Sequence, residues 1–181
     1  MATWNKGTKG NFWDNYTGID NNGDGIGDTP YIIDENNQDN YPLMAPVTIF
    51  EAGMWEWKQY YVDVISNSTV YNFSFNPLEG ALVRFTVSGE DGTAGFCRVT
   101  IPKGLLDSDG DWLVSVGGEL ADWSIVGEDS ENTVLYFTYS HSSKTIEIEG
   151  TSVIPEFPSW AILPILLIAG IAVILVKKKA L

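Results

Sequence analysis

Alternation of apolar and polar residues is the feature that most constrains the fold of this chain. Five short runs between about residues 59 and 150 place their apolar side chains on one face: Tyr71/Phe73/Phe75, Val83/Phe85/Val87, Cys97/Val99/Ile101, Leu135/Phe137/Tyr139 and Ile146/Ile148. Successive side chains of a β-strand point to opposite faces, so this period of two is typical of strands that bury one face. With further runs at QYYVDVIS, WLVSVGG and WSIVGED, about eight strands predict an antiparallel β-sandwich.

The C-terminal stretch predicts a membrane anchor. Residues 160–176 carry no charged side chain, and at 1.5 Å per residue a helix of this length spans roughly 25 Å of hydrocarbon. Three lysines, Lys177, Lys178 and Lys179, follow at once. The positive-inside rule therefore places residues 177–181 in the cytoplasm and the body of the chain outside the membrane. A buried core helix is the alternative, but an uninterrupted apolar run capped by lysines favours the span.

The chain divides into five parts by composition. Residues 1–46 are rich in Gly, Asn, Asp and Pro and predict a compact segment of turns. Residues 47–150 form the β-sandwich, residues 151–159 a proline-containing linker, residues 160–176 the span and residues 177–181 a basic tail. The predicted fold class is mainly β: an immunoglobulin-like sandwich preceded by an irregular Asp- and Gly-rich segment and followed by one transmembrane helix.

Charge and cysteine content exclude several functions. The net charge of -14, from 24 acidic and 10 basic residues, argues against nucleic acid as a partner. Cys97 is the only cysteine, so neither an internal disulfide nor a cysteine-based zinc site can form. Because Cys97 shares a face with Val99 and Ile101, we expect a buried thiol and not a nucleophile.

The sequence DNNGDGIGD, residues 20–28, has the spacing of the first part of a calcium loop. Oxygen ligands fall at alternate positions: Asp20, Asn22, Asp24, the Ile26 carbonyl and Asp28. A chain wrapped around a cation points every second side chain inward, and a glycine such as Gly25 permits the sharp turn. We therefore predict calcium as a cofactor, with a turn held by side-chain to backbone hydrogen bonds as the alternative.

The acidic ligand that usually closes such a loop is missing. Position 12 is Tyr31, where an EF-hand has a bidentate Glu. Asp34, Glu35 and Asp39 are the candidates for an additional metal ligand.

No catalytic constellation is identifiable, so we predict a protein that is not an enzyme. His141 is the sole histidine and lies beside serines, where an exposed turn residue is expected. Trp55 and Trp57 could stack on glycans, or they could belong to the core and to a seam between the two segments. The triplets beginning at Asn15, Asn67 and Asn72 match the glycosylation acceptor pattern.

Four segments resemble parts of archaeal secreted and surface proteins. The run NFWDNYTGIDNNGDGIGDTPYIIDENNQDNYPLM resembles the segment that closes NosD-like right-handed parallel β-helix domains. GFCRVTIPKGLL and LYFTYSHSSKTIEIEGT look like a β-sandwich module next to the anchor of such proteins. Pro155, Glu156 and Phe157, with the apolar run and the lysines, resemble a PEF-type sorting signal, which implies processing by an archaeosortase-like membrane enzyme.

The resemblance implies that β-helix coils would precede Trp4, and the first residues do not have the pattern of a signal peptide. We therefore expect the C-terminal portion of a longer secreted protein. The predicted function is that of a single-pass cell-membrane protein with a calcium-stabilised exterior, acting in surface display, adhesion or envelope structure through surface glycans or envelope proteins. The alternative is the accessory or anchor portion of a β-helix carbohydrate-active enzyme or carbohydrate-binding protein.

Overall fold

The computed structural model describes residues 4–55, 57–75, 77 and 81–153, and all their regular structure is β. The strands are β1 (Tyr31–Asp34), β2 (Asn37–Asp39), β3 (Val47–Trp55), β4 (Lys58–Ser66), β5 (Thr69–Phe75), β6 (Leu82–Ser88), β7 (Ala94–Pro102), β8 (Leu106–Asp107), β9 (Leu113–Val116), β10 (Glu119–Leu120), β11 (Trp123–Glu128), β12 (Asn132–Ser140), β13 (Lys144–Glu149) and β14 (Ser152–Val153). The prediction of a mainly β chain is confirmed.

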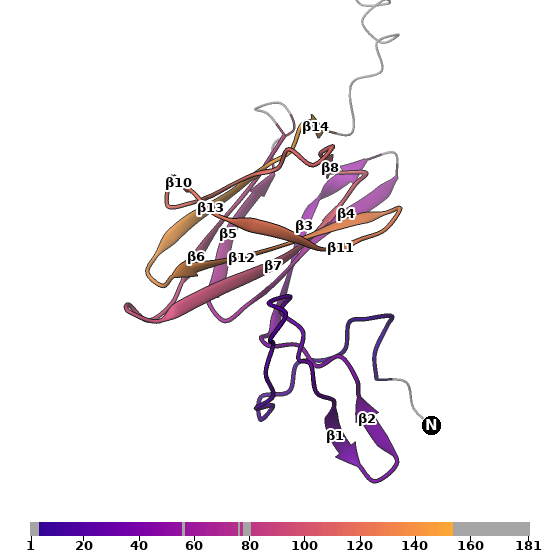
Figure 1. The fold of residues 1–181 in the computed structure, drawn as a ribbon. Helices are drawn as coiled ribbons and strands as arrows, with labels where there is room; N and C mark the ends of the chain where they lie inside the picture. The colour runs from indigo at the N-terminus through magenta and orange to yellow at the C-terminus, as the bar shows by residue number, and fades with distance from the viewer. Residues whose placement is uncertain (1–3, 56, 76, 78–80, 154–181) are drawn as a thin grey trace, which may run out of the picture.

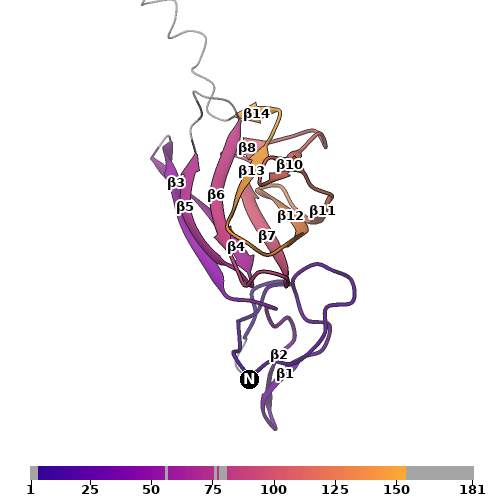
Figure 2. The same ribbon diagram turned by 90° about the vertical axis from the view of Figure 1, so that its left-hand side faces the viewer.

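Two five-stranded antiparallel sheets form the body of the molecule (Figures 1 and 2). One has the order β10-β9-β13-β6-β5 and the other the order β11-β12-β7-β4-β3. Two small two-stranded sheets, β1-β2 and β14-β8, complete the described structure. Ten strands thus make the two main sheets, where the alternating runs had predicted about eight.

The core lies between the two main sheets. Val83, Phe85 and Val87 of β6 are fully buried on one side, and Val99 of β7 and Phe137 of β12 face them from the other. Cys97 is likewise fully buried, as its place in the alternating pattern predicted. Each large apolar side chain removed from water contributes roughly 1.5–3 kcal/mol. The sheets therefore stay together without a covalent cross-link.

The first strand of the second sheet carries a weaker pattern. The edge strand β3 alternates between half-buried and exposed residues, and its pairing with β4 slips between Glu51 and Gly53. Gly53 has φ +124° at this bulge, a backbone conformation that glycine adopts most readily. An edge strand buries only part of one face, so its sequence shows little contrast between the two faces.

The N-terminal segment, residues 4–46, lies at one end of the sandwich, and β14 lies at the other (Figures 1 and 2). A second buried cluster of Ile26, Leu43, Ala45 and Ile65 joins the segment to the sandwich. The Nζ of Lys9 lies 2.7 Å from the Oδ2 of Asp63 on β4 and adds an ion pair. The segment is irregular apart from β1 and β2, in agreement with the predicted succession of turns.

No helix long and apolar enough to cross a bilayer occurs within the described residues. The predicted span at residues 160–176, the basic tail and the sorting motif Pro155, Glu156 and Phe157 lie outside them.

Candidate metal centre

Asp20 shapes the loop that carries the predicted calcium ligands. Its Oδ1 accepts a hydrogen bond from the backbone N–H of Asp24 at 3.0 Å, and its Oδ2 accepts one from the N–H of Gly25 at 2.8 Å. Asp28 accepts from the N–H of Asn21 through Oδ2, and Asp24 accepts from the N–H of Ile26 through Oδ1, both at 2.8 Å. These bonds curl the chain into the compact turn that the glycine spacing predicted.

Four of the five predicted ligand residues line one pocket. Asn22, Asp24, Ile26 and Asp28 surround a space of about 350 Å³, together with Arg98 of β7 and other residues. Among the hydrogen bonds of the described residues, one carboxylate oxygen of Asp24 and one of Asp28 have no protein donor. Two carboxylates, an amide and a backbone carbonyl are the oxygen types that Ca²⁺ prefers, and water would complete its six to eight ligands.

Arg98 closes this pocket from the sandwich side. It alternates with the core residues Cys97 and Val99 and so belongs to the outer face of β7, yet it is only 7% exposed. The loop of residues 20–28 covers it: a β-carbon added at Gly25 would lie 3.1 Å from Cδ of Arg98. Burial lowers the pKa of Arg98, while the charges of Asp24 and Asp20 act in the opposite direction.

The charges at the pocket are unequal. Asp20, Asp24 and Asp28 carry three formal negative charges, and Arg98 carries one positive charge. Nε of Arg98 is buried and has no hydrogen-bond partner, and no ion pair within 4.0 Å joins Arg98 to these carboxylates among the described residues. The guanidinium therefore neutralises the loop only in part, and one divalent cation would balance the remaining charge.

The other candidate ligands lie elsewhere. Asp39 is fully buried and accepts hydrogen bonds from the N–H of Asn11, the indole N–H of Trp13 and the N–H of Tyr41. Asp34 accepts from Asn36 and Asn37 in the turn between β1 and β2, and these bonds lower its pKa. Glu35 is exposed in the same turn. None of the three is among the residues that line the pocket.

No group of three or more His, Cys, Asp or Glu residues in the described part of the chain is arranged to hold a metal by acidic, thiol or imidazole side chains alone. A cation in this pocket would depend on Asn22, the Ile26 carbonyl and water beside the two aspartates.

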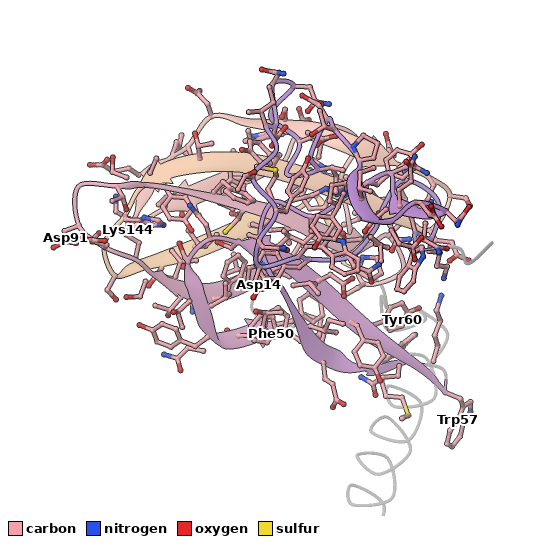
Figure 3. The ribbon with its side chains drawn as sticks, turned by 90° about the horizontal axis from the view of Figure 1, so that it is seen from below. Asp14, Phe50, Trp57, Tyr60, Asp91 and Lys144 are labelled. Atoms are coloured by element: carbon pink, nitrogen blue, oxygen red, sulfur yellow. The ribbon has the colours of Figure 1, made fainter. Side chains whose placement is uncertain are left out.

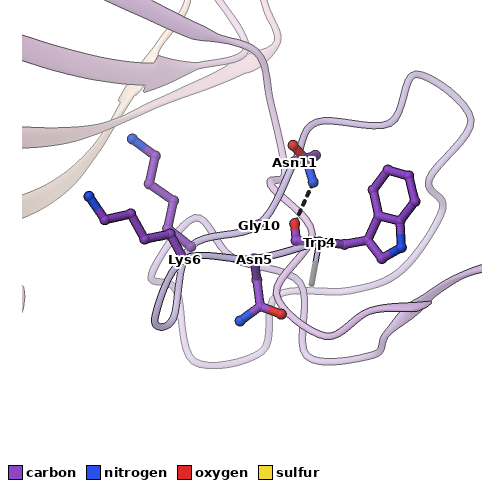
Figure 4. Close-up of a pocket in the computed structure, with 6 residues that line it drawn as sticks. Trp4, Asn5, Lys6, Gly10 and Asn11 are labelled. Carbon is purple, nitrogen blue, oxygen red and sulfur yellow. Dashed lines mark hydrogen bonds between the residues drawn. The ribbon is translucent and has the colours of Figure 1, made fainter. Parts of the chain in front are cut away.

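A second pocket lies within the N-terminal segment itself. It has a volume of about 530 Å³ and is lined by Trp4, Asn5, Lys6, Lys9, Gly10 and Asn11. The side chain of Lys6 and the ring of Trp4 point in opposite directions (Figure 4). Lys9 is paired with Asp63, and no carboxylate lines this pocket. The arrangement offers no acid–base pair and no oxygen cage for a cation.

His141 is not the exposed turn residue that the sequence predicted. It is 8% exposed, and its Nε2 lies 2.8 Å from the hydroxyl of Ser68. Its Nδ1 contacts the hydroxyl of Thr93, which donates to the carbonyl of Glu90 at 2.7 Å. Thr93 therefore accepts from Nδ1–H, which leaves Nε2 free to accept from Ser68.

The Ser68, His141 and Thr93 side chains resemble the nucleophile, base and orienting group of a hydrolase in their order of contacts. Both Ser68 and His141 are buried, however, and neither lines a pocket named above. Gly89 and Gly95 pack closely against the imidazole, since a β-carbon added at either position would lie 2.7 Å from its Nε2. These hydrogen bonds join three connections, those between β4 and β5, β6 and β7, and β12 and β13. The serine-rich sequence around His141 does not predict them.

The two tryptophans that were candidates either for glycan stacking or for the core and seam differ in burial. Trp55 packs against the core, whereas Trp57 is 96% exposed and projects from the rim of the molecule (Figure 3). They form no common stacking surface for a sugar. The seam between the N-terminal segment and the sandwich is made instead by the Ile26 cluster with Phe96.

The three glycosylation candidates are all exposed. Asn15 accepts a hydrogen bond from Tyr31, and Asn72 has φ +54° at a bulge of β5. The side chain of Asn67 donates to the carbonyl of Ala94 and accepts from the N–H of Phe96, so its amide already binds the neighbouring strand β7.

Comparisons with family models, with curated proteins and with solved structures gave no match.

Proposed function

We propose that this chain is a surface protein, anchored by its C-terminal apolar run, whose N-terminal segment is fixed to an immunoglobulin-like sandwich by calcium. Its role is display, adhesion or envelope structure, and it is not an enzyme. The observation that carries the proposal is the convergence of Asn22, Asp24, Ile26 and Asp28 on one pocket with Arg98.

The position of the pocket gives calcium a structural task. Residues 20–28 belong to the N-terminal segment, and Arg98 belongs to the sandwich. A cation that neutralises the loop would remove the repulsion among Asp20, Asp24 and Asp28 and so favour the folded contact with Arg98. Calcium would thereby supply a cross-link that a chain with one cysteine cannot form.

The display role is supported by the arrangement of the two ends. The N-terminal segment and β14 lie at opposite ends of the sandwich (Figure 1). An anchor that follows β14 would hold the N-terminal segment at the far end from the bilayer. This geometry suits a spacer that presents whatever its N-terminal side carries, including the β-helix coils that the sequence resemblance implies.

Calorimetric titration of the full chain in detergent with CaCl₂ tests the calcium site. We expect one saturable site in the parent protein and its loss in the double variant Asp24→Asn, Asp28→Asn, which keeps the side-chain volumes and removes two charges. Asp34→Asn is the matched control, because Asp34 lies in the β1–β2 turn away from the pocket. Equal binding by all three proteins would exclude this pocket.

Vesicle flotation of the same full chain tests the anchor separately. We expect the parent to float with vesicles and a chain truncated after Val153 to remain in the dense fraction. A full chain that stays in the dense fraction would exclude the anchor without bearing on the calcium site.

A further inference from the structure

Trp57 occupies an unusual place in the β3–β4 hairpin. It is 96% exposed and adopts φ +66°. A bulky residue with positive φ is a genuine outlier in protein backbones, and such conformations persist where the surrounding structure enforces them. A large indole held fully in water at such a position gains nothing from the fold of its own domain.

The hairpin below Trp57 is well anchored. Trp55 pairs with Lys58 in the antiparallel ladder, and Trp55 and Tyr60 both pack against the core. Nζ of Lys58 lies 5.2 Å from the centre of the Tyr60 ring, which fixes the base of the tip by a cation–π contact. Met54 is 64% exposed, so Trp57 and Met54 supply two exposed apolar side chains and Lys58 a cation, in a turn whose sequence also contains Glu56. We call Trp57, Met54 and Lys58 the hairpin tip.

Contacts place the hairpin tip at the end of the sandwich where the described chain ends. Tyr60, three residues beyond Trp57, lies so close to Gly104 that an added β-carbon there would be 2.8 Å from the Tyr60 hydroxyl. Gly104 lies two residues before β8, and Leu106 of β8 pairs with Val153 of β14. The β3–β4 turn and β14 lie at the same end of the ribbon, away from the N-terminal segment (Figure 1).

The sequence after β14 limits how far this end can be from the apolar run. Six residues, and so seven Cα-to-Cα steps, separate Val153 from Trp160, where the run begins. Even fully extended, that length of chain reaches only about 25 Å. Any bilayer that takes up residues 160–176 therefore lies close to the end of the sandwich that carries the hairpin tip.

We propose that the hairpin tip is a second membrane contact, in which Trp57 and Met54 enter the interfacial layer of the bilayer and Lys58 meets the lipid phosphates. This inference rests on the proposed anchor. Tryptophan is favoured at that depth because its ring is apolar while its N–H still reaches a polar partner. Lysine can extend its ammonium toward the phosphates while its stem remains near apolar groups.

A hairpin tip of only three residues is sufficient for membrane contact because the anchor and the tip belong to the same chain. Once residues 160–176 are inserted, the tip is held near the bilayer at a high effective concentration, so a weak contact is populated. The contact orients the sandwich, because the anchor and the hairpin tip both meet the bilayer. The N-terminal segment is then directed away from the membrane.

Spin labels on the full chain in phosphatidylcholine vesicles test this proposal. The label is placed at Met54→Cys with Trp57 retained, and at Ile32→Cys in the N-terminal segment as the matched exposed control. Cys97 is fully buried and stays unlabelled. We expect collisions of the Met54 label with a water-soluble nickel complex to be reduced several-fold relative to the Ile32 label, and Trp57→Ser to reverse that protection.

The outcomes separate this inference from the proposed anchor. A chain that floats with vesicles but leaves both labels equally open to the nickel complex would overturn the membrane contact and leave the anchor intact. Protection of the Met54 label that persists without vesicles and rises with protein concentration would assign the tip to a second copy of the chain, and would also overturn it. A chain that does not float would remove the anchor itself.

Discussion

The side chain of Arg98 lies across Gly25, so closely that a β-carbon on the glycine would be 3.1 Å from Cδ and 3.2 Å from Cβ of the arginine. This contact joins the acidic loop of the N-terminal segment to the outer face of β7. It explains how an arginine on the solvent side of a sheet becomes buried. Glycine is needed at position 25 for two reasons. A side chain there would meet Arg98, and Gly25 has φ +81°, a conformation that other residues rarely adopt.

Gly25→Ala should destabilise the protein by roughly 1–3 kcal/mol, because the new methyl group meets Arg98 and the backbone keeps a left-handed conformation. Urea unfolding at fixed calcium measures the loss. Gly92→Ala is the control: Gly92 has φ +85°, but nothing lies within 4 Å of its added β-carbon. An equal loss in the two variants would show that the contact with Arg98 adds nothing.

Arg98→Met should tighten calcium binding by at least about threefold, because it removes a positive charge that repels the cation. Arg98→Lys keeps the charge and should bind calcium within about twofold of the parent by the same argument. Titration calorimetry of the three proteins measures the dissociation constants. Weaker binding by the methionine variant would mean that Arg98 assists the cation, contrary to the charge argument.

His141→Ala should reduce the free energy of unfolding by about 2–4 kcal/mol, since it leaves a cavity and removes one of the two side-chain partners of the buried Ser68 hydroxyl, the other being the Tyr139 hydroxyl. Chemical denaturation monitored by circular dichroism measures the change. Ser143→Ala, two residues along and exposed, is the control and should leave stability nearly unchanged. A small effect at His141 would show that the tie between Ser68 and Thr93 is dispensable.

Stability should fall in alkaline solution through Cys97. Burial raises the pKa of this thiol from its usual 9.0 to about 11. The neutral thiol is favoured in the folded state, so its contribution is complete below pH 9.0 and is lost as the pH rises to about 11. The loss attributable to this group is about 3 kcal/mol at most.

Urea unfolding between pH 8 and 11 measures this alkaline loss. Cys97→Ala should show a smaller decline, and the remainder includes Tyr139, whose pKa is also raised by burial. Identical pH profiles for the parent and the variant would contradict the assignment to the thiol.

Much of the sandwich could be predicted from sequence because its strands bury one face. Val83, Phe85 and Val87 alternate with polar residues, and all three are fully buried. Sequence pattern also placed Cys97 in the core. The edge strand β3 carries less contrast because it buries only part of one face, so the alternating pattern is clear only from about residue 59.

Residues of the candidate site were predictable only in part. The spacing of Asp20, Asn22, Asp24 and Asp28 is local, so the sequence contains it. Arg98 lies seventy residues after Asp28, and its burial depends on how the loop packs on β7. Alternation within β7 would place Arg98 in solvent, and nothing in the local sequence signals the covering loop.

The burial of His141 was missed for a similar reason. Its hydrogen-bond partners Ser68 and Thr93 come from the β4–β5 and β6–β7 connections. The exposure of Trp57 could not be predicted from the sequence either, because the direction of its side chain depends on the positive φ of its backbone. Neither a contact between loops that are far apart in the sequence nor the backbone conformation of a single residue can be recognised from residue types alone.

Thermal unfolding of the full chain in detergent, with excess calcium and with excess chelator, tests the central claim most directly. A ligand at 100 times its dissociation constant stabilises by about 2.7 kcal/mol, which raises Tm by about 5–10 °C in a chain of this size. We predict this rise in the parent and in Asp34→Ala, and its loss in the double variant Asp20→Ala, Asp24→Ala. A parent Tm that is the same in calcium and in chelator would contradict the account and leave the acidic stretch as a turn held by its own hydrogen bonds.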